Sequence, residues 1–327
     1  MSRKITLVYL MAASHSGSTL TAMLLNSHSD VYTAGELKVT SLGNVDKYRC
    51  SCRTLLKECV FWEKVNHSMK TKGYDFKIAE AGTDFKEIGG YFVRKLLGPL
   101  YRGIWLEWVR DAALWLSPSW RRVYPKKLKI NEDLIHSVSE VAGTDKIVDS
   151  SKIGLRYKFI KRIKSIEIKV IRIVRDGRAV ALTYIDPENF ADAENAEMRC
   201  GGMGGNRDHE KKQMHEAARE WLRSNEEAEA VIRTLNDDQW IQIRYEDLCT
   251  NPDEILNKIF RFIGVDPSKR IENFRNVEHH VIGNGMRLDK TNEVVLDERW
   301  KTSLSEKDLK LFSEIAGEKN RELGYLD

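Results

Sequence analysis

The sequence predicts an α/β fold, with a doubly wound parallel sheet flanked by helices in a single domain spanning residues 1–327. Two observations carry this prediction. Short apolar, β-rich runs alternate with amphipathic runs of helical spacing, the pattern of parallel strands joined by crossover helices. The chain of 327 residues is 42% hydrophobic, which is enough for one large domain with a buried core, and it shows no internal repeat or low-complexity linker.

The first strand is expected at residues 5–11, a continuous apolar run typical of a strand buried on both faces. Arg3 and Lys4 before this run also match the start of a signal peptide. The strand is the preferred interpretation, because a turn from Ala12 to Gly17 and a helix from Ser18 follow it directly.

Residues from about 60 to 145 are predicted to form a helical insertion that contains five tryptophans, Trp62, Trp105, Trp108, Trp115 and Trp120. Aromatic ridges of this kind are usually core. In an enzyme such residues can also line a substrate pocket, and both interpretations stay open here.

Strands and helices alternate again after the insertion. Strands are expected at 146–149, 168–174 and 240–244, and helices at 153–164, from 175 onward and at 210–235. Asn251-Pro252 begins a further helix that Gly264 ends, and Ser305 with Asp308 caps the last one. Ligands of such folds bind at the carboxyl ends of the strands.

The cysteines, Cys50, Cys52, Cys59, Cys200 and Cys249, are too few for a disulfide framework. The spacing Cys50-x-Cys52-x6-Cys59 would bind zinc only with a distant fourth ligand, and it lacks a C-x2-C pair. Free thiols or one local disulfide are therefore preferred, no metal is expected, and the compartment is expected to be cytoplasmic.

The charge balance excludes some partners. A net charge of +4 is too mild to indicate nucleic acid and fits a protein that binds small anions in one pocket. No apolar run approaches the ~20 residues of a transmembrane helix, so no membrane span is expected.

The residues after the first strand predict an anion site. Ala12 to Thr19 joins a strand to a helix, the layout of a P-loop, in which backbone N–H groups and the helix dipole bind phosphate. The side chains that face such a ligand are Ser14, His15, Ser16, Ser18 and Thr19, around Gly17. The alternative is a serine-rich turn without a ligand.

This loop lacks the lysine of the nucleoside-triphosphate form, G-x-x-x-x-G-K-[S/T], which serves the β- and γ-phosphates. Gly17 and Thr19 fit that form, but Ala12 replaces its first glycine and Ser18 its lysine. The loop therefore favours a donor group that is smaller and less charged than that of ATP or GTP.

A second anion site is predicted where the 168–174 strand ends. Arg175 follows the apolar run directly, and Thr183 lies eight residues later on the next helix. One segment thus places a guanidinium and a hydroxyl around one phosphate, and the planar fork of arginine suits paired hydrogen bonds. Arg178 is expected to be structural or exposed. The two sites together hold a nucleotide at two ends.

With these two sites in this order, the sequence resembles the sulfotransferase family, in its branch related to carbohydrate and tyrosyl-protein sulfotransferases. Three further segments are similar to that family: Cys50 to Trp62, as in bacterial members; Arg244 to Cys249 with Asn251-Pro252 and the helix to Gly264; and His280 to Arg287 with Trp300. The resemblance covers nearly the whole chain except the helices between about 65 and 140.

The resemblance implies a fold related to nucleotide kinases, in-line transfer without a metal, and 3′-phosphoadenosine 5′-phosphosulfate (PAPS) as co-substrate. Ser14 to Thr19 would bind the 5′-phosphosulfate, and Arg175 with Thr183 the 3′-phosphate. Tyr245 is expected near the adenine or the 3′-phosphate, or else as a core aromatic. Gly283, Asn284 and Arg287 are expected to close over the nucleotide, with Arg287 as a further phosphate contact.

Sulfonate transfer needs a base, stabilisation of the bridging oxygen and in-line positioning. Glu36 matches the family's catalytic glutamate and is the expected base, with its pKa raised by desolvation. Lys152, just past a strand end, is expected to stabilise the bridging oxygen or the sulfonate; a solvated lysine is the alternative. His15 stands where the family's loop carries arginine, which weakens one charge contact. His15 and His28 are alternative bases, although a structural cap is the more ordinary role for His28.

Two other functions compete with a sulfotransferase. A P-loop small-molecule kinase would need the absent loop lysine and a magnesium carboxylate, for which Asp149 is the candidate. A non-catalytic nucleotide-binding protein is the other, against which Glu36, Lys152 and Arg175 together argue.

The acceptor is expected to be a hydroxyl or amine of a small molecule or carbohydrate. The helical insertion and the stretch from Asp186 to His209, with glycines that predict a mobile lid, are expected to shape its site. The identity of the acceptor and the oligomeric state stay open.

Overall fold

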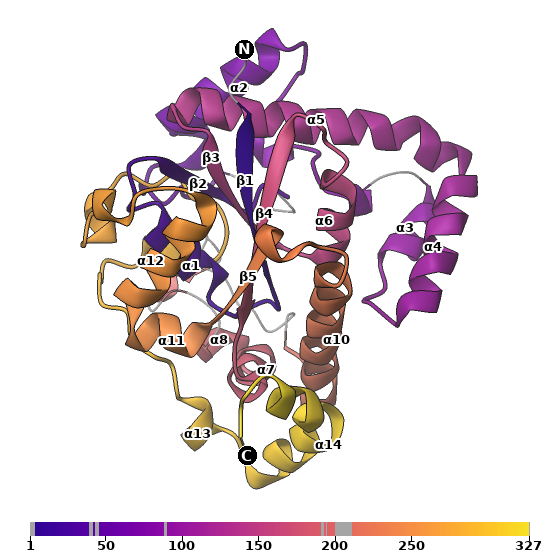
Figure 1. Ribbon diagram of the computed structural model, residues 1–327, viewed down its shortest axis with the longest axis vertical. Coiled ribbons are helices and arrows are strands. Elements are labelled where there is room, and N and C mark those ends of the chain that lie inside the picture. The colour runs from indigo at the N-terminus through magenta and orange to yellow at the C-terminus, as the bar shows by residue number, and fades with distance from the viewer. Residues whose placement is uncertain are drawn as a thin grey trace.

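A five-stranded sheet forms the centre of the molecule in the computed structural model, which describes residues 4–38, 42, 46–87, 90–190, 193, 195–199 and 211–326. The strand order is β2-β3-β1-β4-β5, and all paired strands run parallel (Figure 1). The strands are β1 Ile5–Ala12, β2 Val31–Gly35, β3 Lys146–Lys152, β4 Ile166–Val174 and β5 Trp240–Arg244. The predicted doubly wound parallel sheet is confirmed.

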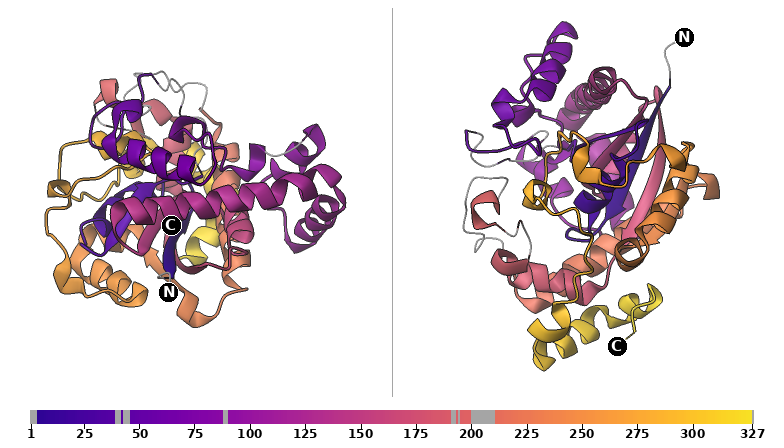
Figure 2. Two further views of the ribbon diagram at one scale, coloured as in Figure 1. Left: turned by 90° about the horizontal axis from the view of Figure 1, so that it is seen from above. Right: turned by 90° about the vertical axis from the view of Figure 1, so that its left-hand side faces the viewer.

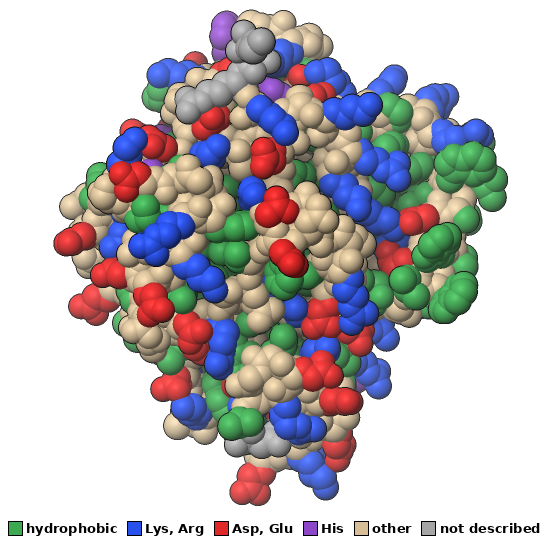
Figure 3. All heavy atoms as spheres, in the orientation of Figure 1, with side chains coloured by type: hydrophobic (Ala, Val, Ile, Leu, Met, Phe, Trp, Pro, Cys, Tyr) green, Lys and Arg blue, Asp and Glu red, His purple; other side chains and the backbone are tan. Residues whose placement is uncertain are grey.

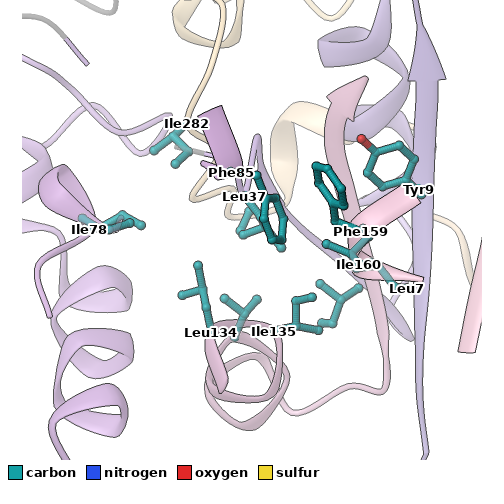
Figure 4. Close-up of a cluster of buried hydrophobic side chains, with 14 of the residues drawn as sticks. Leu7, Tyr9, Leu37, Ile78, Phe85, Leu134, Ile135, Phe159, Ile160 and Ile282 are labelled. Atoms are coloured by element: carbon teal, nitrogen blue, oxygen red, sulfur yellow. The ribbon is translucent and has the colours of Figure 1, made fainter. Parts of the chain in front are cut away.

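Strand β1 shows why helices cover both faces of this sheet. All eight of its residues are buried. Because successive side chains of a strand point to opposite faces of the sheet, they pack into two separate cores. Leu7 and Tyr9 belong to the larger core (Figure 4), whereas Val8 and Leu10 belong to the core on the other face.

Helices surround the sheet on both sides (Figures 1 and 2). Their bounds are α1 Ser18–Leu25, α2 Val60–Thr71, α3 Tyr91–Leu97, α4 Ile104–Leu116, α5 Pro118–Ala142, α6 Gly154–Ile160, α7 Gly177–Ile185, α8 Pro187–Phe190, α10 Met214–Ile232, α11 Tyr245–Thr250, α12 Pro252–Ile263, α13 Trp300–Ser303 and α14 Glu306–Glu322. Helices α2, α5 and α6 pack on the larger core, and α1, α11 and α12 pack on the other. In the described part of the chain, every helix is too short or too polar to cross a membrane.

The expected strands and helices are present with small shifts of their ends. Gly264 ends α12 in the left-handed conformation that glycine tolerates best, and Ser305 accepts a hydrogen bond from the backbone of Asp308 at the start of α14. The sequence prediction missed β2. This strand has only five residues, and it forms because β3 and the segment around Ile282 pair with its backbone.

The tryptophans of the helical insertion divide into two groups. Trp62 and Trp120 are buried, as the core interpretation predicts. That interpretation is wrong for Trp105, Trp108 and Trp115, which are 82%, 70% and 68% exposed. Helix α4 buries only Arg110 and Leu114, and Figure 3 shows hydrophobic side chains on the surface over α3 and α4. The side of α4 that carries Arg110 and Leu114 therefore packs against the protein, and its other sides face solvent.

Candidate active site

The predicted phosphate loop lies between β1 and α1, at the carboxyl edge of the sheet. His15 and Gly17 have φ angles of 62° and 83°, in the left-handed region, so the chain turns sharply before α1. The Ser16 hydroxyl is buried and makes no hydrogen bond within the described structure. Since the first N–H groups of a helix also lack intrahelical partners, the loop offers a buried hydroxyl and backbone donors to an anion.

Tyr245 closes one side of this loop. Its ring lies so near Gly17 that a Cβ atom there would come within 2.3 Å of Tyr245 Cδ2. The guanidinium of Arg175 lies over the same ring, 4.3 Å from its centroid. Glycine is therefore required at position 17 both by the backbone angle and by this ring. The structure brings together three predicted residues that follow β1, β4 and β5 along the chain.

Arg175 links the two predicted anion sites. It is 6% exposed, and its Nη1 donates to the carbonyl of His15 at 2.7 Å. Its Nη2 forms an ion pair with Asp297 at 3.1 Å, while its buried Nε has no hydrogen-bond partner among the residues that the structure describes. A buried guanidinium with an unused donor, fixed to the phosphate loop, suits an anion.

Asp297 is an acidic partner that the sequence analysis did not single out. Burial by itself raises the pKa of Asp297, but hydrogen bonds from Arg299 and the charge of Arg175 outweigh it and lower this pKa to about 2. The Asp297 carboxylate thus places a negative charge beside Arg175, where a bound phosphate would also place one. The signal in the sequence is weak, because one aspartate in a charged loop is ordinary.

Thr183 lies on α7, which begins two residues after Arg175. The hydroxyl is buried and donates to the carbonyl of Val180 at 2.7 Å. This local bond satisfies the hydroxyl's proton, and its oxygen keeps acceptor capacity. The role of Thr183 at a 3′-phosphate stays a prediction.

Glu36 and Lys152 form an ion pair at the ends of β2 and β3. Both are largely buried, with side chains 22% and 14% exposed. Lys152 has a φ angle of 68°, and the pairing of β1 with β3 shifts register just before it. Strained backbone of this kind clusters at functional sites. The structure therefore places the expected base next to the expected cation.

The pKa of Glu36 moves in the opposite direction to the expected one. Burial by itself raises it, but the charge and the hydrogen bond of Lys152, helped by Lys38 and Arg287, outweigh burial and hold the pKa below its ordinary value. The expectation of a raised pKa was wrong because it did not include a lysine in direct contact. Glu36 is therefore a carboxylate at neutral pH, in the form that accepts a proton.

Asp149 holds the backbone on both sides of this pair. It is fully buried, forms an ion pair with Arg156 at 3.2 Å, and accepts hydrogen bonds from the amides of Leu37 at 3.2 Å and Ser151 at 2.9 Å. Leu37 follows Glu36, and Ser151 precedes Lys152. Since these bonds use its oxygens, Asp149 is a structural carboxylate and a poor candidate for magnesium.

Lys38 is a second cation beside Glu36 that the sequence analysis did not identify. Burial lowers the pKa of Lys38, and the Glu36 carboxylate partly offsets this. Its amide donates to Ser151 Oγ at 2.9 Å, and its carbonyl accepts from Thr83 at 2.7 Å. A lysine two residues after the expected base was the available signal, since residues so close in the sequence also lie close in space.

The segment with Gly283, Asn284 and Arg287 lies against Glu36. The amide of Glu36 donates to the carbonyl of Ile282 at 3.2 Å, and Gly283, with φ 140°, would place a Cβ 3.5 Å from Glu36 Oε1. Asn284 accepts from the amide of Met286 at 3.0 Å and so caps a short helical turn. The segment is thus in place beside the expected base.

Arg287 holds this segment from within. It is 1% exposed, donates to the carbonyls of Gly283, Asn284 and Arg49 at 2.6, 3.0 and 2.5 Å, and lies over the Tyr48 ring at 4.7 Å. These contacts give Arg287 a structural role, and its contact with a phosphate stays a prediction.

The remaining candidates make contacts within the protein or fall outside the described residues. His28 is 1% exposed, bonds the carbonyl of Asp266 at 2.7 Å and accepts from the amide of Asp30 at 3.0 Å, which fits the cap interpretation. Arg178 pairs with Asp176 at 2.8 Å and covers the Trp300 ring. His15 packs edge-on against Tyr184 at 5.0 Å. Cys200 and the lid glycines up to Gly205 lie outside the described residues.

Comparison with known proteins places the chain in a family. A model described as the sulfotransferase domain matches residues 102–324. The chain is 25% identical over 192 residues to carbohydrate sulfotransferase 2 of Mus musculus, a match that spans 49% of this chain and 35% of that protein. The chain thus matches about a third of that relative's length.

Solved structures similar to this chain include three sulfotransferases. The sulfotransferase domain of the Synechococcus PCC 7002 olefin synthase is 16% identical, with a TM-score of 0.47 and coverage of 97% of both chains. The sulfotransferase domain from the curacin biosynthetic pathway is 18% identical, with a TM-score of 0.47 and 99% of both chains covered. Mouse sulfotransferase SULT7A1, complexed with PAP, is 13% identical, with a TM-score of 0.41 and coverage of 98% and 89%.

The family match begins within the helical insertion and takes in β3, β4, α7 and β5, and so Lys152, Arg175 and Tyr245. The phosphate loop and Glu36 lie before it and rest on their own geometry. Because the model covers more than half of the residues, the resemblance seen in the sequence is confirmed: the chain belongs to the sulfotransferase domain family.

Proposed function

We propose that this protein transfers the sulfonate group of PAPS to a hydroxyl or amine of a small-molecule or carbohydrate acceptor by in-line displacement. The observation that carries the proposal is the ion pair of Glu36 with Lys152 at the same edge of the sheet as the phosphate loop. This edge therefore combines a base, a cation and an anion site.

The residues present fit the nucleotide. Ser16 offers a buried hydroxyl and Arg175 a buried Nε, and neither has a hydrogen-bond partner in the described part of the chain. Arg175 also bonds the loop that contains Ser16, through the carbonyl of His15. We assign the 5′ end of the nucleotide to Ser14 through Thr19 and the 3′-phosphate to Arg175 and Thr183. Tyr245 packs between these two sites and is placed to contact the nucleotide.

The chemistry follows from the states of the two charged side chains. Glu36 accepts the proton of the acceptor hydroxyl or amine as the acceptor atom bonds to sulfur. The bond from sulfur to the bridging oxygen of the 5′-phosphate breaks, and 3′-phosphoadenosine 5′-phosphate (PAP) leaves with that electron pair. Lys152, held near Glu36, stabilises the charge on the bridging oxygen or on the sulfonate. His15, in place of the family's arginine, contributes a weaker contact to the sulfonate.

The structure argues against the kinase alternative. A magnesium-dependent kinase needs a free carboxylate at the strand end, but Asp149 is bound by Arg156 and two backbone amides. We assign the acceptor site to the helical insertion at about 60–145 and to the segment from 186 to 209.

The test is calorimetric binding of PAP, without magnesium, to the wild type and to Arg175→Ala. We expect tight binding by the wild type and a loss of at least about tenfold in the variant, since hydrogen bonds to charged groups contribute about 1.5–3 kcal/mol each. Arg261→Ala, which removes an exposed arginine of α12, is the control for the loss of one positive charge and should bind like the wild type.

Other results would change the assignment. Magnesium-dependent ATP binding without PAP binding would put the kinase first. PAP binding without release of PAP from PAPS in the presence of any acceptor would indicate a non-catalytic nucleotide-binding protein.

A further inference from the structure

Three cysteines and one histidine come together away from the phosphate loop. Cys50, Cys52 and Cys59 are close in the sequence, and His280 lies 221 residues after Cys59. The sulfur atoms and one ring nitrogen all lie within 4.8 Å of one another, and Cys50, Cys59 and His280 are buried. His280 is the distant fourth ligand whose absence from the sequence pattern argued against a metal.

The distances are close to those of a tetrahedral zinc site. Zinc–sulfur bonds of about 2.3 Å and a zinc–nitrogen bond of about 2.0 Å place neighbouring ligand atoms about 3.6–3.8 Å apart. Cys52 Sγ and Cys59 Sγ are 3.7 Å apart, and His280 Nδ1 is 3.8 Å from Cys50 Sγ and 3.2 Å from Cys59 Sγ. All three cysteines are free thiols, so no disulfide explains their approach.

The surroundings orient the four side chains toward one point. A tight turn, with Arg53 at φ 69°, returns the amide of Cys50 to the carbonyl of Thr54 at 3.0 Å and presents Cys50 and Cys52 together. The His280 ring stacks on Phe61 at 4.8 Å. Its Nδ1 faces the sulfurs, while Nε2 lies 3.1 Å from the Glu278 carboxylate. A carboxylate is one of the usual partners of the far ring nitrogen in a zinc-bound histidine.

We propose that Cys50, Cys52, Cys59 and His280 bind one zinc ion with a structural role. Three cysteines and one histidine complete the coordination of zinc, so no position is left for water or substrate, and thiolate with imidazole ligands favour zinc over magnesium or calcium. The ion does not take part in sulfonate transfer.

The site joins the turn of Cys50 to the segment that lies against Glu36. Val281, next to His280, exchanges hydrogen bonds with Ser51 at 2.7 and 3.3 Å. Ile282 then bonds the backbone of Ala34 and of Glu36. Zinc therefore holds this segment in place beside Glu36, and the importance of that position for catalysis rests on the proposed function.

The test is the metal content of the full-length protein, purified without chelators and with any affinity tag removed, by elemental mass spectrometry. We expect about one zinc ion per chain in the wild type and nearly none in Cys59→Ser. Cys249→Ser, which removes a buried free thiol outside the cluster, should retain its zinc. His280→Cys keeps four ligands and should also retain zinc, whereas His280→Ala should lose most of it.

Three further measurements use the wild-type protein and so apply even where a variant fails to fold. Titration of the wild-type thiols with an organomercurial should release zinc in step with thiol modification, and cobalt-substituted protein should show the visible absorption of a tetrahedral thiolate site. Zinc removal should speed amide hydrogen exchange at Ile282 and Glu36 severalfold, whether or not PAP binds.

A wild-type protein without zinc after growth with added zinc would overturn the proposal, as would a disulfide between Cys52 and Cys59 in its mass spectrum. Unchanged hydrogen exchange at Ile282 after zinc removal would overturn the structural role. None of these results depends on PAP binding, so a failure of the proposed function is detected separately.

Discussion

Glu36 and Asp149 are acidic side chains at the same edge of the sheet, yet their surroundings give them different roles. Asp149 is fully buried and bound by Arg156 and backbone amides, so its oxygens are already used. Glu36 is partly exposed and bonded to Lys152, a flexible side chain that is able to move to a substrate. Of these two carboxylates, Glu36 is therefore the one with an oxygen available to accept a proton.

Replacing Glu36 with glutamine should reduce the rate of transfer and leave PAP binding nearly unchanged. Glutamine keeps the shape but does not accept the proton, and general bases typically contribute about 10²–10⁴-fold to a rate. The measurement is kcat for PAP release from PAPS, with PAP affinity by calorimetry. Glu140→Gln is the matched control, because Glu140 also pairs with a lysine, Lys72, on the surface. A Glu36→Gln enzyme with wild-type kcat would remove Glu36 from the mechanism.

At the scale of elements, the end of β3 is the part of the fold that shapes the site. The register shift between β1 and β3 and the positive φ angle of Lys152 turn the chain out of the sheet at that point. Asp149 holds this turn and the residue after Glu36 through hydrogen bonds to Ser151 and Leu37. Strands β2 and β3 thus present Glu36 and Lys152 to each other.

The variant Asp149→Asn should lose stability and activity together. It leaves the buried Arg156 without its ion-pair partner, a change that typically costs about 3–5 kcal/mol, and it weakens the bonds that position Leu37 and Ser151. Urea unfolding and kcat at a temperature where the variant is folded test both effects. Asp133→Asn, which breaks the pair with Lys129 on α5, should change stability less and leave kcat unchanged. Equal kcat in Asp149→Asn and wild type would show that Asp149 is structural only.

At the scale of the whole molecule, the pair of Arg175 with Asp297 connects the end of β4 to the segment before α13. The Asp297 carboxylate neutralises the guanidinium and repels any phosphate that binds there. If a nucleotide phosphate binds Arg175 as proposed, its binding is coupled to the position of this C-terminal segment through one ion pair.

We expect Asp297→Asn to bind PAP more tightly than the wild type, by about fivefold, since one partly exposed charge contact contributes up to about 1 kcal/mol. The gain should shrink at high salt, which screens the charges. Calorimetry at two salt concentrations measures both effects. Weaker PAP binding by this variant would mean that Asp297 positions Arg175 rather than competing with the phosphate.

The same pair predicts a pH effect on stability. The pKa of Asp297 is lowered from 3.8 to about 2 in the folded protein. Its carboxylate therefore stabilises the fold above the unfolded value, and this contribution is lost as the pH falls through the folded value. Urea unfolding should show the largest difference between wild type and Asp297→Asn near neutral pH, and a shrinking difference in acid. A difference that stays constant with pH would contradict this origin.

The sequence by itself predicted the order along the chain of the main helices and of every strand of the sheet except β2, and it predicted the location of the phosphate loop. Apolar periodicity, helix caps and the turn before α1 are local properties, and neighbouring residues decide them. Arg175 and Lys152 were identified at the site because each follows the end of a predicted strand, whereas Glu36 and Tyr245 were identified mainly from the resemblance to the sulfotransferase family.

Only the tertiary structure decided which of these residues meet and what charge they have. The pKa of Glu36, the occupied state of Asp149 and the pairing of Arg175 with Asp297 depend on side chains from distant parts of the chain. His280 likewise completes the cysteine cluster from 221 residues away. Spacing along the chain does not encode such distances, because the packing of β1, β3 and β4 fixes them.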